Sequence, residues 1–384
     1  MKKLAYIDGL KGLGALMVYL SHFVFAFYYA AYSLQPEHAN TEGGIEIILG
    51  KTPLNILYNG NFAVRLFMVV SGFVLCLGYF KTRDKMKLKV GAVKRYFRLA
   101  PLILISNMLI VILMYFGCYR NSETAVFTKS LDWFYGFNHF TPRLSEALYE
   151  SLIGCFVNGS NDYNGVLWTI PYLFWGALIV YLAAYLLGEN SLRYIAYGVM
   201  LLVLLRTDFA GIIFGFIMCD LWYTLEKWLE RYSRYPVIPI LIFILGCYLA
   251  SYPSIGISME GTIYAMLGTP KVITYHLLGA VLIVAGILGC NSLQKLFGCR
   301  PLQYLGKVSY SLYLWHFPVI ATFSSWFFGM FKGILGYQIT VFIDFILTTL
   351  LVLIISRLSE KYLETLGKYM ENRIVKLMIP KRIG

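Results

Sequence analysis

Long apolar runs separated by short polar segments extend along the whole chain. About 20 consecutive apolar residues cross a ~30 Å hydrocarbon core as a helix, and several runs reach that length. The predicted membrane spans are residues 12–32, 61–80, 99–116, 164–187, 192–205, 209–224, 237–251, 271–289, 305–328 and 335–356. The fifth to seventh of these are shorter than a full span. The pattern therefore predicts an all-α, polytopic integral membrane bundle of about ten transmembrane helices.

Composition supports one membrane-embedded domain. The 384 residues are 59% hydrophobic and only 14% charged, whereas soluble domains carry about 25% charged residues. We expect a transmembrane bundle over residues 1–356 and a basic cytoplasmic tail over 357–384. The first apolar run is longer than the core of a signal peptide and no A-x-A-like site follows it, so we expect it to persist as the first span.

Positive charge predicts the orientation. Most of the 33 Lys and Arg residues fall before the first span, between residues 81 and 98, or after residue 356. Alternating spans place these segments on one side, and the positive-inside rule makes that side the cytoplasm. Both termini are thus predicted to be cytoplasmic, in a multi-pass protein of the cytoplasmic (inner or plasma) membrane. The net charge of +13 then reflects topology and lipid contact, and no nucleic-acid partner is expected.

The first span carries charged and ionisable residues, which are costly inside a bilayer and suggest function. Lys11 and His22 are about three turns apart, so they share one helix face at ~16 Å separation. This places Lys11 at the cytoplasmic surface and His22 near the midplane. Asp8 lies one turn from Lys11 and can pair with it. A histidine satisfied by neighbouring hydroxyl groups is an equally good interpretation of His22.

The ninth span provides a second intramembrane histidine. Ser309, Tyr313 and His316 follow one helical stripe, and His316 lies ~14 Å into the membrane from Lys307. Pro318 predicts a kink just beyond it. Two imidazoles at similar depth suggest a shared cavity, and histidine is the usual general base near neutral pH.

Other polar positions allow two interpretations each. Arg95 and Arg98 share a helix face beside Lys94, and such a cluster holds a phosphate or acts as stop-transfer charge. Trp168 is typical of an interfacial anchor. Pro171, close behind it, predicts a broken turn next to protein or a wet cavity.

The second external stretch, residues 117–163, carries aromatic rings beside amides and carboxylates. Such residues bind sugars or order a loop against the bundle, and both remain open for Asp132, Trp133, Tyr135, Asn138 and His139.

The remaining histidine and cysteine positions suggest structural roles. His276 is interpreted as structural. The seven cysteines form no C-x-x-C pair, which argues against a metal site. Whether Cys118 and Cys155 pair stays open.

Six segments carry motifs in a distinctive order. They are residues 6–22 with Asp8-Gly-Leu-Lys11-Gly and His22, residues 67–73 with Ser71, residues 94–101, residues 167–169 with Trp168, residues 309–318 with Tyr310, and residues 360–361. Together they resemble the membrane acyltransferase family 3 over nearly the whole chain. Two departures stand out. Lys11 replaces the usual Arg and loses its bidentate geometry. The acidic residue common after the Leu-Trp-Ser/Thr motif is absent, with Leu173 or a neighbour in its place.

The resemblance implies transfer of an acyl group, most often acetyl from cytosolic acetyl-CoA, to a hydroxyl of an extracytoplasmic glycan or glycolipid. Acyl-CoA is then a co-substrate, and no tightly bound cofactor is expected. The implied catalytic residues are His22 as general base, with His316 and Tyr313 orienting it or stabilising the oxyanion. The implied phosphate-binding residues are Lys11, Lys94, Arg95 and Arg98. The implied positioning residues are Asp8, Ser71, Trp168, Ser309 and Tyr310.

Two other functional classes compete with this one. A transporter or flippase for a glycan or lipid-linked intermediate also uses midplane polar groups, but it is expected to show internal repeats, and the two halves are not convincingly similar. A binding or sensing membrane protein without turnover is the third hypothesis.

Overall fold

The computed structural model describes residues 4–225, 235–254, 259–267 and 272–378, and within them the chain forms helices and loops with no β-strand. Seven described helical segments are long and apolar enough to cross a membrane. They are α1 (Ala5–Phe27), α4 (Gly60–Thr82), α5 (Met86–Tyr115), η5 with α9 (Gly165–Leu187), α14 (Val272–Gly289), α16 through α17 (Arg300–Leu335) and α18 (Tyr337–Met378). The predicted polytopic helical membrane bundle is confirmed.

Three shorter apolar helices account for the three short predicted spans. They are α10 (Arg193–Leu204), α11 (Phe209–Thr224) and α13 (Val237–Ala250). At 1.5 Å per residue, the 12 residues of α10 extend only ~18 Å, which is less than the ~30 Å hydrocarbon core. This helix therefore does not cross the full core as a straight helix on its own.

Several helices begin or end away from the predicted bounds. Helix α1 begins at Ala5 and ends at Phe27, so Asp8 and Lys11 are helical. Helix α5 starts at Met86, before the predicted span at residue 99, so the basic residues 94–98 are helical and Arg95 and Arg98 can share a helix face. The hydropathy pattern ends at charged residues, but Lys and Arg are good helix formers and the helices continue through them. For the same reason α18 extends to Met378, well into the predicted tail.

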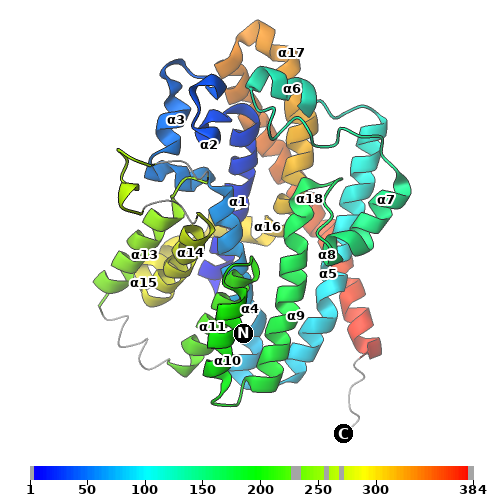
Figure 1. Cartoon of the computed structure of the whole chain (residues 1–384). Coiled ribbons are helices and arrows are strands. Elements are labelled where there is room, and N and C mark those ends of the chain that lie inside the picture. Colours follow the sequence, from blue (N-terminus) through cyan, green and yellow to red (C-terminus); the bar gives the residue numbers. More distant parts are fainter. Residues whose placement is uncertain (1–3, 226–234, 255–258, 268–271, 379–384) are drawn as a thin grey trace.

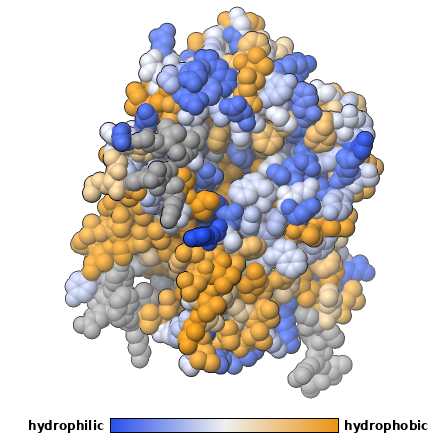
Figure 2. Space-filling view, viewed as in Figure 1, coloured by the Kyte–Doolittle hydropathy of each residue, from blue (hydrophilic) through white to orange (hydrophobic). Residues whose placement is uncertain are grey.

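Short helices gather at one end of the bundle, the upper end in Figure 1. Helices α2 (Ala30–Ser33), α3 (Ile45–Gly50) and α6 (Asn121–Thr128) lie there, and α7 (Leu144–Tyr149) lies at the right-hand side at about mid-height. The chain ends marked N and C both lie towards the lower end. Figure 2 shows hydrophobic residues dominating the lower part of this face and hydrophilic residues gathered over its upper part. The upper end therefore holds residues from both 33–60 and 117–163, the two stretches that the charge pattern predicts to be external.

Helices α1 and α16 pack at close range through glycines. A Cβ atom on Gly12 would lie 2.4 Å from the backbone N of Gly306, and one on Gly306 would lie 2.1 Å from the carbonyl O of Asp8. Real Cβ atoms do not tolerate such distances, and small residues are what allow two membrane helices to approach this closely. The contact aligns the two helices that carry His22 and His316.

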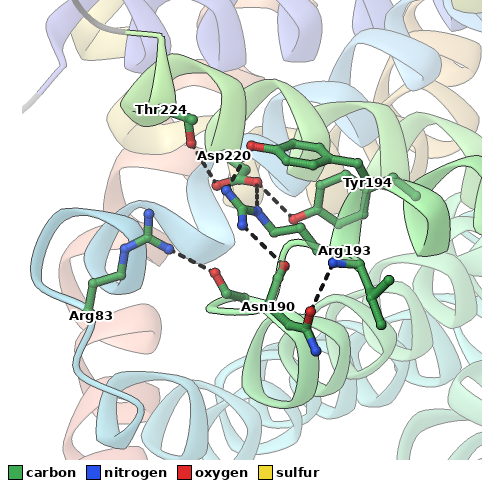
Figure 3. Close-up of polar contacts among 9 residues, drawn as sticks. Arg83, Asn190, Arg193, Tyr194, Asp220 and Thr224 are labelled. Atoms are coloured by element: carbon green, nitrogen blue, oxygen red, sulfur yellow. Dashed lines mark hydrogen bonds and ion pairs between the residues drawn. The ribbon is translucent and has the colours of Figure 1, made fainter.

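A polar cluster joins the lower ends of α10 and α11. Asp220 is fully buried, and its carboxylate accepts hydrogen bonds from Arg193 Nε at 2.7 Å and from the Tyr197 and Thr224 hydroxyls (Figure 3). Arg83, at the end of α4, donates to the Gly188 carbonyl nearby. A buried charge is tolerated only when paired, and these contacts join α10 to α11, while the Arg83 bond ties the loop before α10 to the end of α4.

We predict that Gly306→Ala lowers the thermal stability of the protein in detergent, because overpacking a close contact typically costs about 1–3 kcal/mol. Gly198→Ala is the matched control, since Gly198 is also helical and a Cβ atom there meets nothing within 4 Å. A thermal unfolding series followed by size-exclusion chromatography measures both. Equal midpoints for the two variants would contradict the close α1–α16 contact.

Candidate functional site

The structure brings His22 and His316 together inside the bundle. His22 lies on α1 and His316 on α16, and the distance between His22 Nδ1 and His316 Nε2 is 2.8 Å. Their rings stack with centroids 4.9 Å apart. His316 is fully buried, whereas His22 is partly exposed towards a cavity. The two intramembrane histidines therefore form one hydrogen-bonded pair.

The backbone assigns the tautomers of this pair. His316 Nδ1 lies 2.9 Å from the Leu312 carbonyl oxygen, which can only accept, so Nδ1 carries the proton. In the neutral ring His316 Nε2 is then an acceptor, and His22 Nδ1 donates to it. This leaves the lone pair on His22 Nε2. A histidine whose second nitrogen is held in this way is an oriented base.

Aromatic rings surround His22 on its other sides. Trp133 lies 5.3 Å and Phe317 5.5 Å from it between ring centroids, and Phe25 stacks on Trp133. Trp133 comes from the external stretch, so part of that stretch covers the histidine pair. Asn138 has a packing role, because its amide donates to the Tyr163 carbonyl. The ring of His22 is thus enclosed by protein rather than turned to lipid.

An outer cavity of about 180 Å³ adjoins His22. Its polar and aromatic lining includes Ser21, Tyr32, Trp133, Trp168 and Ser254. Tyr32 lies in α2, just after the first span, and Ser254 follows α13. No motif or spacing in the sequence connects either residue with His22. In Figure 2 the upper part of the molecule is hollowed between its hydrophilic flanks.

A second, inner cavity of about 320 Å³ lies below the first. Its lining combines three basic residues, Lys11, Arg95 and Arg98, with apolar residues and six residues that carry a hydroxyl group. The six are Ser71, Thr169, Tyr181, Ser309, Tyr310 and Tyr313. Two residues, Val64 and Tyr313, line both cavities.

The basic residues predicted to bind phosphate differ in their surroundings. Arg95 donates from Nε and Nη2 to the Leu173 carbonyl, at 3.2 and 3.1 Å, which fixes its guanidinium against α9. Arg98 is exposed at the inner cavity. Lys11 lies 3.9 Å from Asp8. Lys94 instead pairs with Glu371 at 2.9 Å, on the far part of α18.

Two tyrosines of α16, Tyr310 and Tyr313, hold that helix against its neighbours, whereas Ser309 bonds within it. The Tyr313 hydroxyl donates to the Val166 carbonyl and lies 2.7 Å from Thr169 Oγ1. The Tyr310 hydroxyl donates to the Leu99 carbonyl of α5, and Ser309 donates to the Gly306 carbonyl of its own helix. Directly after Pro318 the chain changes to a π-helix, Ile320–Ser324, where the sequence predicts a kink.

Segment η5 (Gly165–Thr169) enters the bundle as a 3-10 turn and continues into α9 (Ile170–Leu187), so Pro171 lies in the first turn of α9. Proline is tolerated there because that position has no intrahelical N–H bond to lose, and the sequence prediction of a turn broken at Pro171 becomes a change from 3-10 to α-helix just before it. Glu150 fixes the loop that precedes it, because its carboxylate accepts from Asn107 Nδ2 and from the backbone N–H groups of Asp162 and Tyr163. Burial raises the pKa of Glu150, and the Tyr163 N–H opposes this rise. This anchoring places Trp168 at the outer cavity.

His276 and the cysteines do not take part in the histidine site. His276 Nε2 donates to the Tyr252 carbonyl at 2.7 Å, in agreement with its structural interpretation. Cys118 and Cys155 are both free thiols. Among the described residues, no group of three or more His, Cys, Asp or Glu side chains could hold a metal ion.

Comparison with known proteins identifies the family. A family model described as an acyltransferase domain matches residues 4–358. The chain is 21% identical to Acyltransferase R4 of Phoma sp., over 87% of this chain and 86% of that protein. It is 24% identical to Acyltransferase clz18 of Cochliobolus lunatus, over 83% of each.

A bacterial relative matches over a shorter region. O-acetyltransferase OatA of Staphylococcus aureus is 37% identical, over 18% of this chain and 10% of that protein. No solved structure gives a significant match. Because the family model covers nearly all of the helical bundle, including both histidines, the chain belongs to the acyltransferase family 3 of membrane proteins.

Proposed function

We propose that this acyltransferase moves an acetyl group from cytosolic acetyl-CoA to a hydroxyl of an extracytoplasmic glycan or lipid-linked saccharide, with His22 as general base. The observation that carries the proposal is the position of the histidine pair. His22 opens on the outer cavity, and of the residues that the structure describes only Val64 and Tyr313 line both this cavity and the basic inner one. Donor and acceptor can thus meet while each stays on its own side of the membrane.

The inner cavity suits an acyl-CoA. Its three basic residues match the anionic phosphates of CoA, since guanidinium groups form charge-assisted hydrogen bonds with phosphate oxygens. Its apolar depth, which includes Phe67 and Leu75, suits the acyl thioester arm. The positive-inside rule assigns this cavity to the cytoplasmic side, where CoA is found.

The outer cavity suits a saccharide hydroxyl. Trp133 and Trp168 offer ring faces for a sugar, and Ser21 and Ser254 offer hydroxyl groups. The name of the Staphylococcus relative, an O-acetyltransferase, supports acetyl as the group transferred. The fungal relatives support acyl transfer in general.

The chemistry uses the free lone pair of His22 Nε2. The acceptor hydroxyl gives its proton to Nε2 as its oxygen attacks the thioester carbon. The C–S bond then breaks, and the proton passes from Nε2 to the leaving sulfur, giving the ester and free CoA thiol. His316 holds His22 in the required tautomer through the Nδ1–Nε2 hydrogen bond, as the orienting carboxylate does for the histidine of a catalytic triad. No observation specifically favours a flippase.

We predict that His22→Ala reduces acetyl transfer by about 10²–10⁴-fold, because that is what a positioned general base contributes. Transfer of labelled acetyl from acetyl-CoA into the glycan fraction of membrane vesicles measures it. The variant should insert and accumulate as the wild type does. Retained transfer would remove His22 from the mechanism.

His316 is expected to act by positioning, which a conservative replacement tests. His316→Gln keeps an amide oxygen that can accept from His22 Nδ1, whereas His316→Leu keeps only volume. We therefore expect His316→Gln to retain clearly more activity than His316→Leu in the same vesicle assay. Equal loss in both variants would mean that His316 does more than orient its neighbour.

Arg98→Ala is predicted to raise the KM for acetyl-CoA about tenfold, the effect of losing one charge-assisted hydrogen bond. Lys94→Ala should raise it less, because the Lys94 ammonium is engaged by Glu371. Lys89→Ala, on the same helix, is the control for general surface charge. Steady-state thiol release at varied acetyl-CoA distinguishes the three. An unchanged KM in Arg98→Ala would argue against this phosphate site.

A further inference from the structure

Two side chains form the boundary between the inner and outer cavities. Val64 of α4 and Tyr313 of α16 line both. Segment η5 passes the same level, because its consecutive residues Trp168 and Thr169 line the outer and the inner cavity respectively. His22 lies on the outer side of this boundary. A thioester held in the inner cavity must therefore pass Val64 and Tyr313 to reach it.

Tyr313 is the fixed half of the boundary. Its hydroxyl is bonded to the Val166 carbonyl and to Thr169, both in η5. Its ring contacts Phe67 and His316, with centroids 6.2 and 6.1 Å away. Contacts at both the hydroxyl and the ring leave little freedom of movement.

Val64 contributes volume alone. Its side chain is buried, with 7% exposed, and it carries no hydrogen-bonding group. A cavity of 180 Å³ has room for water as well as for an acceptor hydroxyl, since one water occupies about 30 Å³ of liquid. Water that reaches the thioester would compete with the acceptor. The size of the side chain at position 64 is thus the simplest control over whether water crosses from the outer cavity to the thioester.

We propose that Val64 and Tyr313 form a partition that admits the acyl group and withholds water, so that the volume of residue 64 sets the ratio of acyl transfer to thioester hydrolysis. This inference rests on the proposed function. Both reactions break the same C–S bond and return a proton to the CoA sulfur. In transfer the new C–O bond is to the acceptor oxygen, and in hydrolysis it is to water, which yields the free acid.

The test uses inside-out membrane vesicles that contain the full-length protein and its native acceptor, with acetyl-labelled acetyl-CoA as the probe. Labelled acetate measures hydrolysis, and label in the glycan fraction measures transfer. For Val64→Ala we expect the acetate-to-glycan ratio to rise at least about tenfold, because one methylene in a close-fitting pocket already changes discrimination by about that factor and this substitution removes two carbon atoms. The ratio rather than either rate is decisive, because it is independent of protein amount.

Val70→Ala is the matched control. Val70 is buried on the same helix, with 1% exposed, and it lies outside the residues that line either cavity. The same truncation there should leave the ratio at the wild-type value. An equal rise in both variants would show that loosening the bundle is enough, and it would overturn the proposal.

A larger side chain tests the opposite direction. Val64→Phe should narrow the passage, so that kcat for transfer falls while the KM for acetyl-CoA stays near the wild-type value. A changed KM with unchanged kcat would place Val64 in the donor site and overturn the partition. An acetate-to-glycan ratio in Val64→Ala equal to that of the wild type would also overturn the partition. If the wild-type vesicles incorporate no label into the glycan fraction, the proposed function itself fails. If the wild type transfers the label and the Val64 variants show the same ratio as the wild type, only the partition fails.

Discussion

The contact between α1 and α16 is the constraint on which the site depends. Because Gly12 and Gly306 have no side chains, the two backbones can approach closely, and small residues commonly form such contacts between membrane helices. Because the helices are rigid, this contact near their lower ends fixes their relative position further up. His22 and His316 then meet at hydrogen-bond distance, and the Leu312 carbonyl completes the tautomer assignment.

Helix geometry explains which parts of the site the sequence predicted. His22 and His316 were placed at similar depth because the rise per residue is constant and both helices were recognisable. Pro171 marks the start of α9, because proline is tolerated in the first turn of a helix but not in its interior. The predicted first span begins at residue 12, whereas α1 begins at Ala5. Hydropathy falls at Lys11, but helix propensity does not.

Other parts of the site had no signal in the sequence. Val64 is an apolar residue on an apolar helix, so nothing distinguishes it from its neighbours until its position between two cavities is known. Tyr32 and Ser254 join the outer cavity from segments far apart in the chain. The pairing of Lys94 with Glu371 depends on how far α18 extends, which the apolar pattern underestimated.

The account is tested most directly by an experimental structure with a non-hydrolysable acetyl-CoA analogue in which the thioester sulfur is replaced by a methylene group. We predict that its phosphates lie at Arg98 and Lys11 and that its carbonyl carbon lies at Val64 and Tyr313, facing His22 Nε2. An analogue that enters from the outer side, or one whose acyl group ends away from the histidine pair, would contradict it.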